Sequence, residues 1–166
     1  MNRRLALLAL LPLALLGAGM TDAKPPAAAP ATSGHAMFDV DGIKWGNAPP
    51  ALPKGAQVAV LAGNPDTAGP FTLRLKTPPG YKVALHWHPT DERVTVIQGD
   101  FHVQMGAGAD THAHTFAPGG YVVLPARMRH AASTQGGAIV QIDSIGPFEI
   151  HYVNAKDDPR TAAAGH

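Results

Sequence analysis

The chain has 166 residues and a formal net charge of +1, from 13 lysine and arginine and 12 aspartate and glutamate side chains. This balance, without a basic run, gives no electrostatic basis for binding nucleic acid. The sequence contains no cysteine, which excludes disulfides and thiolate metal ligands. We therefore expect a small-molecule partner and no nucleic-acid partner.

Residues 1–23 have the pattern of a signal peptide. Arg3 and Arg4 precede an apolar run over residues 5–16, and small residues follow. The run is too short to cross a bilayer comfortably, so we predict cleavage, no stable membrane insertion afterwards, and a periplasmic or secreted protein. An uncleaved membrane anchor is the alternative. Cleavage removes Arg3, Arg4 and Asp22, which takes the 13 basic and 12 acidic side chains to 11 of each.

Three segments follow the predicted signal peptide. Residues 24–35 are rich in proline and alanine, a composition typical of a flexible linker. Residues 36–160 are long enough for one folded domain. Residues 161–166 are small and polar, which predicts a disordered tail.

Glycine and proline interrupt residues 36–160 roughly every 8 to 12 residues, a rhythm typical of an all-β sandwich or barrel. No helix-length amphipathic stretch and no internal repeat accompany it. Small antiparallel barrels bury one face of the sheet and leave a cavity at the mouth. The expected strands are residues 57–61, 71–76, 82–88, 92–98, 101–105, 112–116, 121–124, 130–134, 138–145 and 148–153.

Three histidines and one glutamate have a spacing that favours a metal site. His86 and His88 are two residues apart in an expected strand, so their side chains point to the same face. Glu92 begins the next strand after a short bend, and His130 reaches the same point from a later strand. Two exposed polar residues would explain His86 and His88 alone, but not the whole set. Imidazoles with a carboxylate suit a divalent Mn, Fe, Co, Ni, Cu or Zn ion better than Ca²⁺ or Mg²⁺.

These residues stand in two motifs that resemble those of the cupin superfamily. The motifs are Gly80-x5-His86-x-His88-x3-Glu92-x6-Gly99 and Gly119-x5-Pro125-x4-His130. The second departs from the pattern twice, with Arg127 in the usual place of glycine and Thr134 in the frequent place of asparagine. The likeness to small, single-domain, exported cupins implies an RmlC-like jelly-roll barrel, or double-stranded β-helix. The metal ligands that it implies are His86, His88, Glu92 and His130. It implies no single reaction, because this fold hosts many.

Strand parity predicts which side chains accompany the paired histidines. With His86 inward, Ala84 shares its face, whereas Leu85 and Trp87 point outward. An apolar outer face needs a cover. Either the N-terminal segment around Phe38 and Trp45 provides it or a second subunit does, and we expect a homodimer.

Two further residues are candidate substrate contacts. Arg127 lies in the turn before His130, where it could pair with a substrate carboxylate or phenolate. A solvated turn charge is the alternative. Thr134 shares the inward face of His130, which places its hydroxyl near the metal site. The other histidines of the ordered part are expected at the surface or at strand edges: His102, His112, His114 and His151.

Glu92 is the candidate catalytic residue, because a carboxylate could leave the metal and act as a general base. Open coordination positions would then serve water, substrate or O₂. We therefore expect a metal-dependent enzyme, such as a dioxygenase, decarboxylase or isomerase, that acts on a small organic molecule in the barrel cavity. A non-catalytic module that binds or senses a metal or small molecule is the alternative.

Overall fold

The computed structural model describes residues 35–106, 108 and 111–162, which belong to one compact unit. The predicted signal peptide and all of the predicted linker except His35 lie outside these residues. Within the described part of the chain, no helix has the length and apolar character needed to cross a membrane. The folded unit is built almost entirely from strands.

The strands are short, and only brief helical turns flank them. In chain order the strands are β1 (Gly46–Asn47), β2 (Gln57–Ala62), β3 (Gly69–Thr77), β4 (Lys82–Trp87), β5 (Glu92–Gly99), β6 (Phe101–Met105), β7 (His112–Phe116), β8 (Tyr121–Leu124), β9 (His130–Ser133), β10 (Ala138–Gly146) and β11 (His151–Tyr152). The helical turns are η1 (Val40–Gly42), η3 (Ala155–Asp157) and α1 (Pro159–Ala162).

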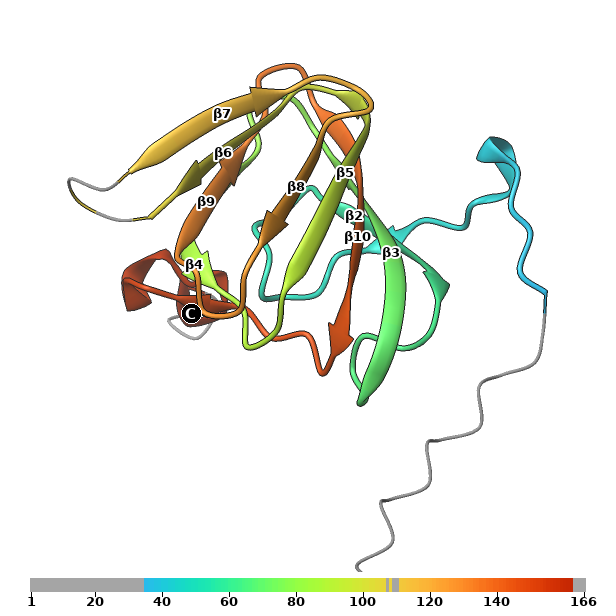
Figure 1. Ribbon diagram of the computed structural model, residues 1–166, viewed down its shortest axis with the longest axis horizontal. Coiled ribbons are helices and arrows are strands. Elements are labelled where there is room, and N and C mark those ends of the chain that lie inside the picture. Colours follow the sequence, from blue (N-terminus) through green and yellow to red (C-terminus); the bar gives the residue numbers. More distant parts are fainter. Residues whose placement is uncertain (1–34, 107, 109–110, 163–166) are drawn as a thin grey trace, which may run out of the picture. The chain divides into compact units, whose positions relative to one another are not determined.

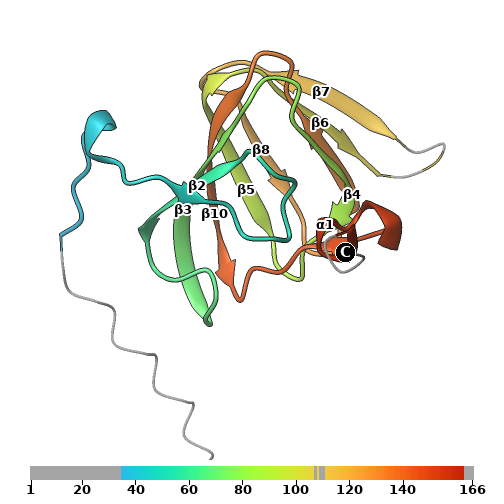
Figure 2. The same cartoon turned by 180° about the vertical axis from the view of Figure 1, so that it is seen from behind.

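Two antiparallel sheets make up the unit (Figures 1 and 2). One has the strand order β1-β2-β3-β10-β5-β8 and the other the order β11-β4-β9-β6-β7. From β3 to β6 the chain alternates between the two sheets, and β10 returns from far along the sequence to pair with both β3 and β5. This is the arrangement of a jelly-roll barrel. The all-β jelly-roll fold predicted from the sequence is therefore confirmed.

The core lies between the sheets and follows from strand periodicity. On β3 every second side chain is buried, namely Phe71, Leu73 and Leu75. The same alternation on β5 and β10 buries Val94 and Val140 in the same cluster. Side chains of this size contribute about 1.5–3 kcal/mol each when fully removed from water. This core holds the two sheets together and fixes the strand ends that carry the candidate site.

The turn between β5 and β6 explains why the first motif ends in glycine. Gly99 has a φ of +81°, a conformation that other residues rarely adopt. A Cβ at this position would lie 2.0 Å from the carbonyl oxygen of Gly137. Asp100 then accepts hydrogen bonds from the backbone amides of Gln135 and Gly136, at 2.8 and 2.9 Å. The turn is thereby locked to the loop that leads into β10.

β1 was not expected from the sequence, and the last strand differs from its prediction, whereas the other strands begin and end within one or two residues of the expected ones. The last strand was predicted over residues 148–153, whereas β11 contains only His151 and Tyr152. In the residues before β11, the Phe148 amide donates a hydrogen bond to the Pro65 carbonyl and the Glu149 carbonyl accepts one from His88 Nδ1. These backbone groups therefore do not pair with a neighbouring strand. Beyond β11, α1 extends into the first residues of the segment predicted as a tail.

A β-bulge in β4 corrects the predicted face of Ala84. The register of β4 against β9 shifts between Val83 and His86, so these two residues share the inner face although they are three apart. Val83 is buried with His86, and Ala84 is only half-buried and does not line the core. The strict alternation used for the prediction holds only in a regular strand, and a bulge breaks it.

The cover over Trp87 comes from the C-terminal part of the chain. The Trp87 ring stacks on His151 of the neighbouring strand, with ring centres 4.2 Å apart and planes 12° from parallel. The Arg127 guanidinium lies 5.5 Å from the centre of the same ring. Trp45 instead lies under the Lys76 ammonium group, 5.7 Å away. The segment around Trp45 therefore does not provide the cover that was considered for the outer face of β4.

Candidate metal centre

The structure brings the four predicted ligands to one end of the barrel interior. They come from three strand ends: His86 lies on β4 with His88 just after it, Glu92 begins β5, and His130 begins β9. All four side chains are buried, with exposed fractions of 2–6%. One ring nitrogen from each of the three histidines lies within 4.8 Å of the others. Three buried histidines thus form a cluster that could hold a metal ion.

Backbone carbonyls fix the orientation of each histidine. The Nδ1 atoms of His86 and His88 lie 2.7 Å from the carbonyl oxygens of Ala84 and Glu149, and His130 Nδ1 lies 3.1 Å from that of Met128. A carbonyl only accepts hydrogen bonds, so each Nδ1 carries the proton. The Nε2 lone pairs of the neutral rings therefore remain free, as metal-binding histidines require.

The bulge in β4 has a direct part in this arrangement. The register shifts between Val83 and His86, and the Ala84 carbonyl inside this bulge accepts the hydrogen bond of His86 Nδ1. The shift also puts His86 on the buried face together with Val83. Bulges often lie beside functional sites, where they change the direction of a side chain.

The Glu92 carboxylate faces the same nitrogens. Its Oε2 atom lies 3.5 Å from His88 Nε2 and 3.2 Å from His130 Nε2. The buried Nε2 of His88 has no hydrogen-bond partner among the described residues. A cation among the nitrogens and the carboxylate satisfies all of them at once. The donor set of imidazoles and one carboxylate fits a divalent transition metal.

Electrostatics keep the site in the form that binds a cation. Burial, together with the nearby rings of His130 and His88, lowers the pKa of His86 from 6.5 to about 3. Burial also lowers the pKa of His88, against the attraction of Glu92. For Glu92, burial alone would raise the pKa, but the neighbouring histidines, His130 first, hold it below its usual value. Neutral imidazoles and an ionised carboxylate are the protonation states that metal ligands need.

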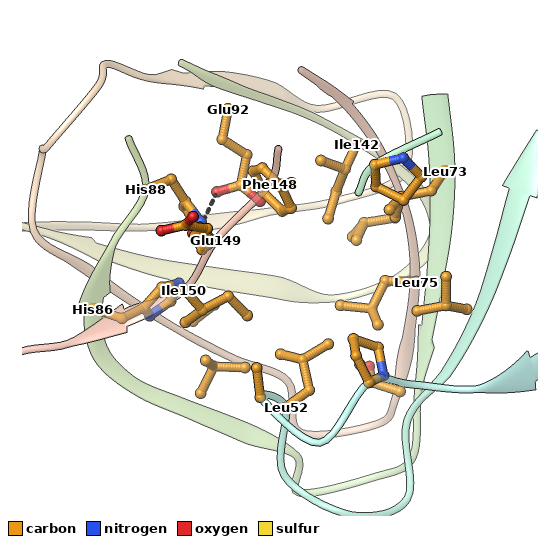
Figure 3. A pocket seen from close by; sticks show the side chains of 18 of the residues that line it. Leu52, Leu73, Leu75, His86, His88, Glu92, Ile142, Phe148, Glu149 and Ile150 are labelled. Carbon is orange, nitrogen blue, oxygen red and sulfur yellow. Dashed lines mark hydrogen bonds and ion pairs between the residues drawn. The ribbon is translucent and has the colours of Figure 1, made fainter. Parts of the chain in front are cut away.

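The cluster lies at one end of a cavity of about 610 Å³ between the two sheets. Figure 3 shows His86 and His88 on one side of this cavity and Leu73 and Leu75 across it. Leu52, from the loop before β2, lines it as well. A small molecule in the cavity would therefore contact apolar side chains along its length and the histidine cluster at one end.

Two tyrosines hold the loop before β2 over the cavity. The Tyr81 hydroxyl donates to the carbonyl of Pro53 at 2.7 Å, and the Tyr152 hydroxyl donates to that of Ala51 at 2.8 Å. Burial raises the pKa of Tyr152 to about 12 and that of Tyr81 further, so both hydroxyls stay protonated as donors. The loop is thus tied to β11 and to the start of β4, the elements next to His86.

The structure places the two predicted substrate contacts differently from one another. Thr134 is buried and lines the cavity, but its hydroxyl donates to Asp100 and accepts from the Gly137 amide, so it braces the turn before β10. Arg127 is exposed, does not line the cavity and lies over Trp87. Its φ of +65° explains why the cupin pattern usually has glycine at this position.

Sequence reasoning missed several residues around the cluster. The Phe148 ring stacks on His88, with centres 4.3 Å apart and planes 11° from parallel. The carbonyl of Glu149 orients His88, and Arg160 of α1 reaches the cavity rim. Partners that act through the backbone leave no mark in residue identity, so no sequence signal pointed to Glu149. For Phe148 the sequence showed only an aromatic residue after a proline, and for Arg160 only an arginine near the end of the chain.

Comparisons with known proteins agree with this fold. The sequence model of the family described as "Domain of unknown function (DUF4437)" matches residues 20–151. None of the functionally curated proteins matches the chain. Among solved structures, an RmlC-like cupin from Shewanella frigidimarina aligns with a TM-score of 0.54 and 18% identity, over 68% of this chain and 91% of that chain.

Two solved enzymes are similar in fold as well. The polyketide cyclase RemF from Streptomyces resistomycificus aligns with a TM-score of 0.58 and 15% identity, over 78% of this chain and 93% of that chain. An oxalate decarboxylase from Lactobacillus farciminis aligns with a TM-score of 0.55 and 15% identity, over 74% of this chain and 37% of that chain. At these identities the likeness is one of fold. It agrees with the jelly-roll fold that the two motifs implied.

Proposed function

We propose that this chain, which belongs to the DUF4437 family and has the cupin fold, is a metal-dependent enzyme that acts on a small organic molecule in its barrel cavity. The proposed ligands of the divalent transition metal are His86, His88, Glu92 and His130. A buried, oriented histidine cluster next to an accessible cavity is the observation that carries the proposal.

The local chemistry supports metal ligation over a structural role for the histidines. Three Nδ1–H groups are bound by carbonyls, which leaves three Nε2 lone pairs and a carboxylate converging in a buried space. Unpaired buried polar groups cost free energy, and His88 Nε2 has no other partner. A metal ion removes this cost.

The cavity supports catalysis over a closed structural site. When bound, the metal supplies Lewis acidity toward an oxygen of the substrate. The cavity walls are mostly apolar, and the loop held by Tyr81 and Tyr152 lines the space in which the substrate would lie. Glu92 is the proposed general base, because its carboxylate lies at the cavity end, is ionised at neutral pH and could leave the metal to accept a proton. An oxygenase, a decarboxylase and an isomerase all fit these roles.

Metal analysis and turnover assays test the proposal together. The protein is purified from its native compartment, its metal content is measured by inductively coupled plasma mass spectrometry, and the protein loaded with that metal is screened for oxygen uptake and for substrate loss. We expect about one equivalent of a transition metal and turnover of at least one small organic compound. The matched control is His130→Ala, which should show neither.

Two outcomes contradict the proposal in different ways. A wild-type protein that binds none of Mn, Fe, Co, Ni, Cu or Zn contradicts the metal site. A protein that binds metal but turns over no compound in a broad panel contradicts the enzyme and favours a module that binds or senses a metal or small molecule. That module was the alternative function considered from the sequence.

We also propose that the mature protein is exported and forms a homodimer. Residues 1–23, on which export rests, lie outside the described residues, so the proposal rests on the sequence alone. The dimer rests on the outer face of β4, where Trp87 stays partly exposed beside His151. Mass spectrometry of the mature N-terminus in a periplasmic extract tests export. Multi-angle light scattering tests the dimer, and a monomer at micromolar concentration would rule it out.

A further inference from the structure

We infer that the cavity accepts a molecule with one oxygen-bearing head group on an apolar body, and that it excludes molecules with a second negative charge. The inference rests on the proposed metal-dependent function and adds the class of substrate. The cavity, of about 610 Å³, lies within the range that buries most of a drug-sized ligand. Its size therefore allows a body well beyond the head group.

The polar groups that could receive a head group gather at one end. His86, His88 and Glu92 lie together on one side of the cavity in Figure 3. A divalent ion next to the ionised Glu92 carboxylate leaves one net positive charge there. One carboxylate, or a neutral hydroxyl or carbonyl, matches this charge, and a second carboxylate has no matching cation at that end.

The rest of the cavity offers mostly apolar surface. Leu73, Leu75 and Ile142 line the cavity from the first sheet, and Leu52 lines it from the loop before β2. An apolar body gains free energy by leaving water for these walls. A carboxylate placed among them would lose its hydration without a partner, which is strongly unfavourable.

The charges at the rim disfavour a second negative charge as well. Among the described residues that line the cavity, Arg160 is the single lysine or arginine. Its guanidinium group is already held by Asp158 at 2.7 Å and by the carbonyl of Ile150 at 3.0 Å. Asp66 and Glu149 also line the cavity, and Glu149 Oε2 lies 2.9 Å from His151 Nε2. Among the described lining residues, a dianion would thus find no lysine or arginine that is free to pair with its second charge.

Binding of matched acids to the zinc-loaded protein tests the inference. Isothermal titration calorimetry is run with straight-chain monocarboxylates from butanoate to decanoate and with the dicarboxylates of the same lengths. We expect the affinity for monocarboxylates to rise about fourfold per added methylene until the cavity is full. Each dicarboxylate should bind at least tenfold more weakly than its monocarboxylate. Equal affinities within each pair, no dependence on chain length, or no binding of any monocarboxylate overturns the inference.

A carboxylate built into the wall tests where the body lies. Leu52→Glu should weaken decanoate binding at least tenfold with unchanged zinc content, because the new charge lies beside the apolar body. The control Val153→Glu makes the same chemical change at an exposed residue outside the cavity lining and should alter neither. If circular dichroism shows that Leu52→Glu is unfolded, Leu52→Ala replaces it, with an expected loss of about fourfold or more. Unchanged affinity in the folded variant overturns the inference.

Zinc analysis of the same samples separates this inference from the function on which it rests. A zinc-loaded protein that binds no monocarboxylate overturns the substrate class and leaves the metal site standing. A protein that binds no metal overturns the proposed function, and the substrate class with it.

Discussion

The chain contains the pattern His-x-His twice, and the two copies have opposite surroundings. The first pair, His86 and His88, is buried where β4 ends, and both Nδ1 atoms are held by carbonyls. The second pair, His112 and His114, is exposed on β7, which lies at the edge of the five-stranded sheet (Figure 1). We call them the buried pair and the exposed pair.

The difference shows that the pattern by itself does not make a metal site. Both pairs place two imidazoles on one face of a strand, but among the described residues only the buried pair meets a third histidine and a carboxylate. Solvent satisfies the nitrogens of the exposed pair, whereas the buried pair has a nitrogen that a cation would satisfy. Partners from other strands therefore decide the chemistry, and the following predictions test that view.

Removal of one histidine from each pair should give the largest contrast. His86→Ala should reduce the metal content to near zero and leave a folded protein with lower stability, because a ligand is lost and bound metal stabilises the native state. Metal analysis and urea unfolding measure both effects. The matched control His114→Ala should keep full metal content. Full occupancy in His86→Ala, or loss of metal in His114→Ala, would break the comparison.

Glu92→Gln tests whether the buried pair needs its carboxylate for chemistry as well as for binding. The substitution keeps the size and one carbonyl oxygen but removes the charge and the base. At full metal occupancy we expect turnover to fall about 10²–10⁴-fold, the usual contribution of a general base. The assay is the rate at saturating metal, with metal content measured in parallel. Activity at the wild-type level under these conditions would remove Glu92 from the mechanism.

The stability of the metal-free protein should fall in acid because of the buried pair. His86 has a pKa of about 3 in the folded protein and about 6.5 when unfolded, so the unfolded state takes up a proton first. Stability is fully present above about pH 6.5 and is lost as the pH falls toward 3, by at most about 1.4 kcal/mol per pH unit from this residue. Urea unfolding at pH 7 and pH 5 measures the slope. His86→Gln should make it shallower, and an equal slope in both proteins would contradict this assignment.

Thr134→Val should have the smallest effect on the metal site and tests whether this buried residue only supports the turn before β10. The change keeps the shape but removes the hydroxyl that bonds to Asp100 and the Gly137 amide. We expect the free energy of unfolding to fall by about 1–3 kcal/mol, with unchanged metal content and unchanged decanoate affinity. Chemical denaturation and calorimetry measure these quantities. A change in decanoate affinity alone would instead make Thr134 a substrate contact, as the sequence suggested.

Much of the fold could be predicted because its signals are local. Gly99 has a positive φ and no room for a Cβ, so a glycine at this position predicts the turn. Apolar residues at every second position, such as Leu73 and Leu75, predict a strand with one buried face. The spacing of His86, His88, Glu92 and His130 predicted that these residues would meet, and they lie together at one end of the barrel.

What the sequence by itself determined is therefore which strands form and which side chains those strands can bring together. The tertiary structure decided the rest: the bulge that puts Val83 and His86 on one face, the carbonyl partner of His88 at Glu149, and the place of Arg127 over Trp87 outside the cavity. Each of these depends on a backbone group or a ring from a distant part of the chain. Residue type and spacing constrain neighbours along a strand, but they do not specify which distant backbone atom will lie opposite a side chain once the two sheets pack.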